Sequence, residues 1–289
     1  MQEITILSGK GGTGKTTISA ALASVANHCV FCDNDVDAAD LHLILHPDIR
    51  EKHTFYGAWQ ASIDTEKCTS CGICISQCRF EAIHLNDKAD YFINPLQCEG
   101  CRLCERVCPE AAISSVRSSN NQWFVSDTRF GKFIHAKMGP GEENSGKLVT
   151  QVRNRSREIA EEINASYIIN DGPPGIGCAT ISSLSGVDRA ILVVEPSKSG
   201  LHDAARLVEL VNSFKIRAYA IINKFDINQD ISEKLKIFFL SKNIEVMAEI
   251  PFDRKMVESM VEGKTIVEYS PDSEISKTVK NIWNKINVA

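Results

Sequence analysis

Short apolar runs alternate along this chain with longer segments in which apolar residues recur every three or four positions. Runs bounded by glycine or acidic residues are typical of buried strands, and the intervening segments are typical of helices. The runs that we assign to strands are 4–7, 29–32, 167–171, 190–195, 218–224 and 245–251. Because strands that alternate with helices form parallel sheets, we predict an α/β fold with a mostly parallel, doubly wound sheet.

Two further patterns lie outside this alternation. Apolar and polar residues alternate over 113–117 and 122–126, on either side of Asn120 and Asn121, which predicts a β-hairpin. Near the C-terminal end, one helix face is apolar and contains Ile275, Val279, Ile282, Trp283 and Ile286. A helix that lies on a membrane surface would have the same pattern, but we expect this one to pack on the sheet.

Residues 8–17 connect the first predicted strand to the first helix. Gly9, four residues, Gly14, Lys15 and Thr16 reproduce the spacing of a P-loop in its strand-to-helix context. The glycines let backbone N–H groups turn inward around phosphate oxygens. We expect Lys15 to reach the β- and γ-phosphates and the Thr16 hydroxyl to bind Mg²⁺. The expected nucleotide-binding residues of the loop are Gly9, Lys10, Gly11, Gly12, Thr13, Gly14, Lys15, Thr16 and Thr17.

Acidic residues follow two of the predicted strands. Asp35 follows strand 29–32 and Asp171 ends strand 167–171, at the edge of a parallel sheet where ligands bind. Asp171 has the form of a Walker B residue that holds the Mg²⁺ shell through water, and residues 172–175 form a switch II loop. Solvent-facing turn positions are the alternative for the other acids near Asp35, namely Asp33, Asp37 and Asp40.

Most of the 11 cysteines fall between residues 62 and 117, where the composition changes abruptly. Two sets have the spacing C-x₂-C-x₂-C-x₃-C, and the second begins 30 residues after the first. This internal repeat resembles a ferredoxin with two [4Fe–4S] clusters, in which the fourth cysteine of each set binds the other cluster. The resemblance implies the ligand sets Cys68, Cys71, Cys74 with Cys108, and Cys98, Cys101, Cys104 with Cys78.

The first cysteine set departs from the ferredoxin pattern at one position. Arg79 follows Cys78, whereas Pro109 follows Cys108 as the pattern requires. The arginine places a positive charge near a cluster, which would raise its potential. Zinc is the competing metal, since C-x-x-C pairs also build tetrahedral sites, but zinc leaves the triple spacing unexplained.

Lys10 narrows the class of nucleotide-binding protein. The pattern Lys-Gly-Gly-x-Gly-Lys-Thr-Thr resembles the deviant Walker A motif of the ParA/MinD and nitrogenase iron protein class. That resemblance implies ATP and an ATP-dependent homodimer, or a heterodimer with a paralogue, in which Lys10 reaches the partner's nucleotide. It assigns catalytic roles to Lys10, Lys15, Asp35 and Asp171, with Asp35 as the switch I residue. It also implies that Asn223 contacts adenine.

Two other segments resemble a more particular group, the MinD-superfamily ATPases with an inserted ferredoxin domain. These are the polar run 139–147, which ends in Gly-Glu-Glu-Asn-Ser-Gly-Lys, and residues 196–203. We therefore expect an ATPase domain over 1–61 and 118–289 and an inserted α+β ferredoxin-like domain over 62–117. The implied function is nucleotide-gated electron transfer to a redox or metallocluster partner. Iron–sulfur cluster assembly or transport and redox-sensing regulation are the alternatives.

Three features keep more than one interpretation. Cys178 either acts as a switch II cluster ligand, as in the nitrogenase iron protein, or is a small buried residue like Cys29 and Cys32. A cluster that bridges two subunits needs a second cysteine in each subunit, but none occurs between Val116 and Asp171. His135 is a proton donor, a cluster neighbour or a structural residue. The run 139–147 is an active-site loop, an interface loop or a surface connection.

Charge and hydropathy restrict the remaining function classes. The net charge of −5 gives no electrostatic footprint for nucleic acid. No apolar run approaches the length of a membrane span, and a strand follows Met1 almost directly, without a signal peptide. We therefore expect a cytoplasmic protein without a nucleic-acid partner, for which membrane binding is not expected.

Overall fold

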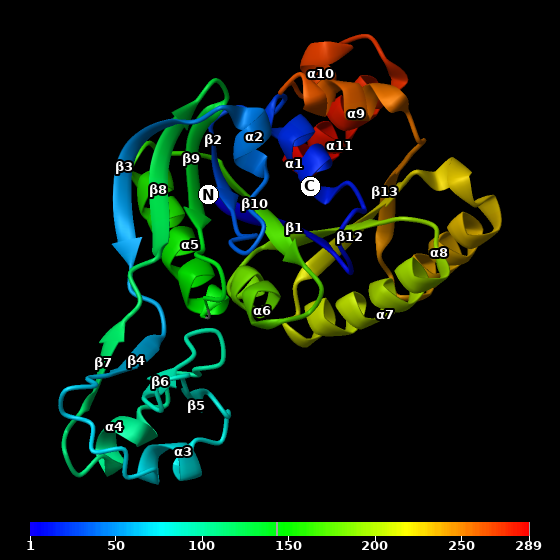
Figure 1. The fold of residues 1–289 in the computed structure, drawn as a ribbon. Helices are drawn as coiled ribbons and strands as arrows, with labels where there is room; N and C mark the ends of the chain where they lie inside the picture. Colours follow the sequence, from blue (N-terminus) through cyan, green and yellow to red (C-terminus); the bar gives the residue numbers. More distant parts are fainter. Residues whose placement is uncertain (143, 289) are drawn as a thin grey trace. The chain divides into compact units, whose positions relative to one another are not determined.

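The computed structural model describes residues 1–142 and 144–288, which form two units (Figure 1). The first unit, here the ATPase unit, comprises Met1–His53, Trp123–Lys137 and Ser145–Ala289. The second, here the cysteine-rich unit, comprises Thr54–Gln122 and Met138–Asn144. Compared with the predicted insertion at 62–117, this unit begins earlier, ends later and includes a segment that precedes residue 145.

A nine-stranded sheet forms the centre of the ATPase unit, with the order β13-β12-β11-β1-β10-β2-β9-β8-β3. The strands from β13 to β9 pair in parallel, so the predicted mostly parallel sheet is confirmed. The strands are β1 (Gln2–Ser8), β2 (Cys29–Asp33), β3 (Asp48–Phe55), β8 (Asn121–Thr128), β9 (Gly131–Lys137), β10 (Tyr167–Pro174), β11 (Arg189–Val194), β12 (Arg217–Asn223) and β13 (Glu245–Ile250).

Helices cover both faces of this sheet (Figure 1). They are α1 (Lys15–Ala23), α2 (Leu41–Leu45), α5 (Ser145–Glu162), α6 (Cys178–Leu184), α7 (Lys198–Ser213), α8 (Gln229–Ser241), α9 (Arg254–Val261), α10 (Ile266–Tyr269) and α11 (Glu274–Val288), with the 3₁₀ helix η1 at Phe225–Ile227. Successive residues of β11 face opposite sides: Ile191 packs in the cluster that contains α1 and α11, and Leu192 packs in the cluster that contains α7 and α8. The sheet is therefore buried on both faces, as parallel sheets require.

The C-terminal helix α11 packs against the sheet, as the pattern of its apolar face predicts. Its five apolar positions are all buried, with exposed fractions of 8% or less, and lie in the same cluster as α1: Ile275, Val279, Ile282, Trp283 and Ile286. Within the described residues, no helix is long and apolar enough to cross a membrane.

The cysteine-rich unit contains two small sheets and two short helices. Its elements are β4 (Trp59–Ile63), α3 (Ile73–Gln77), β5 (Ile83–Leu85), β6 (Tyr91–Ile93), α4 (Leu103–Val107) and β7 (Ile113–Arg117). The sequence repeat reappears as backbone geometry, because each helix begins directly after a residue in the left-handed region: Gly72 (φ 76°) and Arg102 (φ 61°).

The predicted hairpin is wrong, although both of its strands exist. Strand β7 pairs antiparallel with β4, whereas β8 joins the nine-stranded sheet beside β9 and β3. An alternating pattern specifies which face of a strand is buried but not which strand lies beside it. The short Asn120-Asn121 connection suggested local pairing, but the pairing of β7 is with a segment about 50 residues away in sequence.

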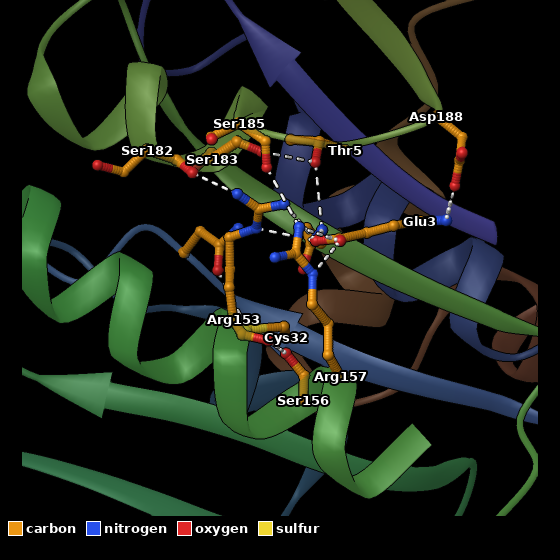
Figure 2. A network of polar contacts seen from close by, with 12 residues as sticks. Glu3, Thr5, Cys32, Arg153, Ser156, Arg157, Ser182, Ser183, Ser185 and Asp188 are labelled. Carbon is orange, nitrogen blue, oxygen red and sulfur yellow. Dashed lines mark hydrogen bonds and ion pairs between the residues drawn. The ribbon is translucent and has the colours of Figure 1, made fainter. Parts of the chain in front are cut away.

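A buried ion network connects strand β1 with helices α5 and α6 (Figure 2). Arg153 of α5 donates from Nε and Nη2 to Glu3 Oε1 at 2.8 and 2.6 Å, and Arg157 Nε donates to Glu3 Oε2 at 2.7 Å. The carbonyl of Ser182 in α6 accepts from Arg153 Nη1, and Asn170 Nδ2 of β10 donates to Glu3 Oε1 at 2.8 Å. These bonds fix α6, the helix that follows the predicted switch II segment.

Candidate functional site

A cleft, here the nucleotide cleft, opens at the carboxyl ends of β1, β2, β10, β12 and β13. It contains about 1150 Å³ of empty space that continues into solvent. Residues 11–17 line it together with Asp35, Asn223 and part of the segment 251–260. Helix α1 begins at Lys15, so the N–H groups of its first turn lie at the cleft wall. This arrangement is typical of a phosphate site, because unpaired N–H groups at a helix start attract anions.

The loop before α1 depends on glycine at two positions in particular. Gly14 has φ +88°, and a Cβ there would lie 2.3 Å from the Asn223 amide nitrogen. A Cβ on Gly9 would lie 2.4 Å from Cβ of Asp203, in helix α7. The loop is thus packed closely between β12 and α7. Any side chain at these positions would push it away from its neighbours.

Lys15 is buried at the base of the cleft and is paired with Asp171. Its Nζ lies 2.8 Å from Asp171 Oδ1, which also accepts from Ser19 Oγ at 2.7 Å. Burial lowers the pKa of Lys15, but the Asp171 carboxylate more than offsets this, so the pKa lies above its ordinary value. The other oxygen, Asp171 Oδ2, is buried and has no hydrogen-bond partner within the described residues. A free carboxylate oxygen of this kind suits the water shell of Mg²⁺.

The acids after β2 differ in their surroundings. Asp35 lines the cleft, and its burial raises its pKa to about 6 although Lys15 acts in the opposite direction. Asp33 is fully buried beside Asp171, not a solvent-facing turn residue. Its carboxylate accepts from the N–H groups of Asp35 and Leu41 at 3.0 and 3.3 Å. Burial and the charge of Asp171 raise the pKa of Asp33 well above its usual range.

The remaining two acids, Asp37 and Asp40, are both exposed, as turn positions would be. Asp40 also lines the cleft.

Lys10 lies at the front of the loop and is bound within its own chain. Its Nζ lies 2.7 Å from Glu195 Oε1 and donates to Ser197 Oγ at 3.2 Å and to Ser199 Oγ at 3.1 Å. Lys224 Nζ contacts the other Glu195 oxygen at 3.2 Å and donates to the Gly12 carbonyl at 2.8 Å. Sequence reasoning missed Glu195 and Lys224 as site residues, although each is the last residue of a predicted strand, at the carboxyl edge of the sheet.

The far end of the cleft is more apolar. Asn223 Nδ2 donates to the Thr13 carbonyl at 2.7 Å, which places its side chain directly behind the loop. Phe252, Met256 and Met260 line the wall beyond it. No sequence signal pointed to these three residues, because they come from the turn and helix that follow β13 and carry no motif. Their apolar surface suits a flat, weakly polar group such as a nucleobase.

Two cavities in the cysteine-rich unit are each lined by four cysteines. One has about 350 Å³ of empty space, and its thiols are Cys68, Cys71, Cys74 and Cys108. The other has about 360 Å³, and its thiols are Cys78, Cys98, Cys101 and Cys104. Each cavity combines three cysteines of one repeat with the fourth cysteine of the other. The structure therefore groups the cysteines in the same two sets that the ferredoxin resemblance implies.

The cysteine sulfurs are not placed to hold a single metal ion. Within residues 1–142 and 144–288, no group of three or more His, Cys, Asp or Glu side chains could do so. The N–H groups of Ala82 and Ala112 donate to Cys78 and Cys108 Sγ at 3.4 and 3.3 Å. Such bonds stabilise a thiolate.

The other cysteines lie outside both cavities. Cys29 and Cys32 are buried, and burial raises the pKa of the Cys29 thiol to about 12. Cys178 is exposed at the start of α6, so its assignment as a small buried residue is wrong. The segment before α6 extends the loop at the sheet edge and leaves this side chain in solvent.

His135 is a structural residue of the ATPase unit. Its ring stacks with Phe133 and Phe124, with centroids 4.6 and 4.9 Å away, and Ser126 Oγ lies 3.1 Å from its Nε2. Burial lowers its pKa to about 4, so the imidazole is neutral near pH 7. The roles of proton donor and cluster neighbour gain no support from these contacts.

The run 139–147 is anchored within the cysteine-rich unit through Glu142. Its carboxylate accepts from Ser118 Oγ, from Asn120 Nδ2 at 3.2 Å and from Asn121 Nδ2 at 3.0 Å. Glu143 lies outside the described residues. The Glu142 contacts indicate a surface connection, and none of the described residues of the run lines the nucleotide cleft.

A parallel sheet with a phosphate loop, a lysine–aspartate pair and acids at the strand ends defines a P-loop nucleotide-binding protein. Comparison with known proteins identifies the family. Residues 4–266 match the CobQ/CobB/MinD/ParA nucleotide binding domain, so the chain belongs to this family. It is an ATP-binding ATPase of the MinD/ParA type, and nucleotide with Mg²⁺ fits its site.

Individual relatives agree with this assignment. The uncharacterized protein MJ0578 of Methanocaldococcus jannaschii is 32% identical over 99% of this chain and 96% of its own length. The iron-sulfur cluster carrier protein of Aquifex aeolicus is 25% identical over 41% of this chain and 36% of its own length. The septum site-determining protein MinD of Pyrococcus horikoshii, solved with Mg-ADP, has a TM-score of 0.60 at 18% identity, covering 99% of this chain and 96% of its own.

Proposed function

We propose that this protein is an ATP-dependent dimeric switch that carries two [4Fe–4S] clusters and gates electron transfer to a redox or metallocluster partner. The ATPase unit supplies the switch and the cysteine-rich unit supplies the redox groups. The family assignment supports the ATPase part. The electron-transfer part rests on the grouping of the cysteines.

The observation that carries the proposal is the crossed composition of the two cysteine cavities. Each contains three thiols from one repeat and one from the other. A Cys₄ set with one distant member is the ligand set of a two-cluster ferredoxin, and a [4Fe–4S] cluster would supply one-electron chemistry there. All four ligand positions of each cluster are protein thiols, which favours electron transfer over release of the cluster.

The residues of the nucleotide cleft have distinct roles in this proposal. Lys15 holds the β- and γ-phosphates, and the Thr16 hydroxyl and Asp171, through water, hold Mg²⁺. Asp35 orients the attacking water, and Asn223 contacts the base. Each of these five residues lines the cleft or, for Asp171, contacts Lys15 directly. Lys10 completes the site of a second copy, so the active form is a homodimer, or a heterodimer with a paralogue.

Anaerobic iron and sulfide analysis tests the cluster assignment. About eight irons and eight sulfides per chain are expected from two cubanes. Cys104→Ser should lower the iron content, whereas Cys178→Ser, which changes an exposed thiol outside both cavities, should leave it unchanged. Bound zinc in place of iron would rule out the ferredoxin assignment.

Nucleotide gating needs a separate experiment. The rate at which the reduced protein loses electrons to an acceptor is measured with ADP and with a non-hydrolysable ATP analogue. The proposal requires this rate, or the cluster potentials, to differ between the two nucleotides. Equal values with every acceptor tried would contradict electron gating while leaving the ATPase assignment intact.

Iron–sulfur cluster transfer is the second candidate, because one relative is named an iron-sulfur cluster carrier protein. A carrier should move its cluster to an apo-protein in an ATP-dependent way, with a matching loss of its own iron. A redox-sensing regulatory ATPase is the third candidate. For this role, Cys71→Ser should alter partner binding although no electron transfer is detectable.

A further inference from the structure

The ammonium group of Lys10 has a complete set of hydrogen-bond acceptors inside its own chain. A lysine ammonium has three N–H donors. Glu195, Ser197 and Ser199 lie 2.7, 3.2 and 3.1 Å from the Lys10 Nζ. Glu195 and Ser197 belong to the short segment that joins β11 to α7, and Ser199 lies in the first turn of α7. Each donor of Lys10 is therefore matched by a partner in cis.

Glu195 is the charged member of this set, and it is shared. Its second oxygen lies 3.2 Å from Lys224 Nζ, and Lys224 in turn donates to the Gly12 carbonyl at 2.8 Å. The two lysines lower the pKa of Glu195 below its ordinary value against the effect of burial. One carboxylate thus holds both the Lys10 side chain and, through Lys224, the backbone of the loop that carries it.

We propose that Glu195 is a positioning residue that retains Lys10 in its own subunit and so sets the threshold for ATP-dependent pairing of two copies. This inference rests on the proposed function, in which Lys10 acts on the nucleotide of the partner. A lysine that is held in cis must break its bonds to Glu195, Ser197 and Ser199 before it can reach across an interface. Pairing therefore competes with the contact to Glu195.

The ion pair between Lys10 and Glu195 is partly exposed, so it can break when two copies pair and form again when they separate. The side chains of Lys10 and Glu195 are 32% and 21% exposed, whereas those of Lys15 and Asp171 are 6% and 1% exposed. Ion pairs that water can reach are weak, and buried pairs are costly to break. The same loop thus carries one lysine that is fixed in place and one that can be exchanged between partners.

Glu195→Gln tests the proposal, since it removes the charge and keeps the shape of the side chain. The protein concentration that gives half-maximal ATPase activity per chain should fall roughly two- to tenfold, because two weak ion pairs per dimer no longer oppose pairing. The matched control is Glu209→Gln, which removes the same charge on α7 from an exposed residue that forms no ion pair within the described part of the chain.

A double-mutant cycle separates this role from a structural one. In a Lys10→Ala background, Glu195→Gln should have no effect on pairing measured by sedimentation with an ATP analogue. An effect that persists without Lys10 would show that Glu195 acts through Lys224 and would overturn the proposal. A Glu195→Gln protein that pairs less well, or equally well, would overturn it too.

Different results would contradict the proposed dimeric switch and the proposed role of Glu195. Should Lys10→Ala leave dimer formation and hydrolysis unchanged, the proposed function itself loses its dimeric switch. Should Lys10→Ala impair both while Glu195→Gln changes neither, the switch stands and only the retention of Lys10 by Glu195 is wrong.

Discussion

The nucleotide cleft and the cysteine-rich unit are stabilised in different ways. The cleft lies at the edge of a sheet with extensive buried clusters on both faces, and its Lys15–Asp171 pair is formed within the protein alone. In the cysteine-rich unit, the buried cluster consists of Cys74, Ile83 and Ile113, with partly buried residues around it. The buried clusters of the ATPase unit therefore hold the residues of the cleft in place without a bound group. The cavities of the second unit are surrounded by the cysteines themselves, so bound clusters would supply much of its stability.

The largest expected effect comes from removing the iron of the proposed clusters, which separates the two regions most clearly. After oxidative loss of iron, amide protection over 54–122 should fall by more than about 100-fold, because metal binding supplies most of the folding free energy of such small units. Protection of β1, β10 and β11 should be unchanged. Hydrogen exchange before and after iron loss measures both. Unchanged protection over 54–122 would show that its core suffices without metal.

Lys15→Ala should affect the nucleotide cleft and not the cysteine-rich unit. Nucleotide affinity should fall by at least about 100-fold, since a charge-assisted contact to phosphate is lost, while iron content should stay as it is. Lys234→Ala, at an exposed position of α8, is the control for calorimetric binding. Lys15→Arg keeps a positive charge beside Asp171 and should also bind poorly. Normal binding by a folded Lys15→Arg protein would contradict the geometric role of this lysine.

Arg153→Met tests whether the ATPase unit depends on its buried network. Removing one partner of a buried ion pair leaves Arg157 as the remaining cation beside Glu3 in the described network, so the free energy of unfolding should fall by about 3 kcal/mol. Arg155→Met, two residues away on α5, breaks partly exposed pairs and should cost under about 1 kcal/mol. Urea unfolding followed by circular dichroism compares them. Equal losses would mean that burial of the network does not determine its contribution.

The smallest expected effect is the pH response of His135. Its folded pKa of about 4 lies below the ordinary value of 6.5, so its contribution to stability is complete above pH 6.5. That contribution is lost as the pH falls toward 4, because the unfolded chain takes up the proton first. Wild-type protein should lose about 2 kcal/mol more than His135→Gln between pH 6.5 and 4.5. The control is His202→Gln, at an exposed position of α7, and should behave as wild type in urea unfolding at each pH.

Much of the fold could be predicted because its signals are local. The P-loop, the acids after the strands and the apolar face of α11 each occupy one short stretch of sequence, and backbone geometry follows from such stretches directly. The pairing of β7 with β4 could not be predicted in this way. Pairing is chosen among all strands with a compatible face, and the alternating pattern of 113–117 is equally compatible with several partners.

The burial or exposure of single side chains was the other feature that could not be predicted from the sequence. Asp33 is the kind of residue that is common in turns, yet it is fully buried, because the register of β2 with β10 places it opposite Asp171. Cys178 is the kind of residue that is common in cores, yet it is exposed at the start of α6. In both cases the position in the fold, not the residue type, decides the environment.

The sequence by itself determined the class of nucleotide site and the spacing of the cysteines, because both depend on residues that are close together in the chain. Only the tertiary structure decided which cysteines share a cavity and where Lys10 finds its partners. Those contacts join residues that are far apart in sequence, so they exist only once the strands and helices have packed. Glu195, which carries no motif, acquires its proposed role from the position of β11 beside β1.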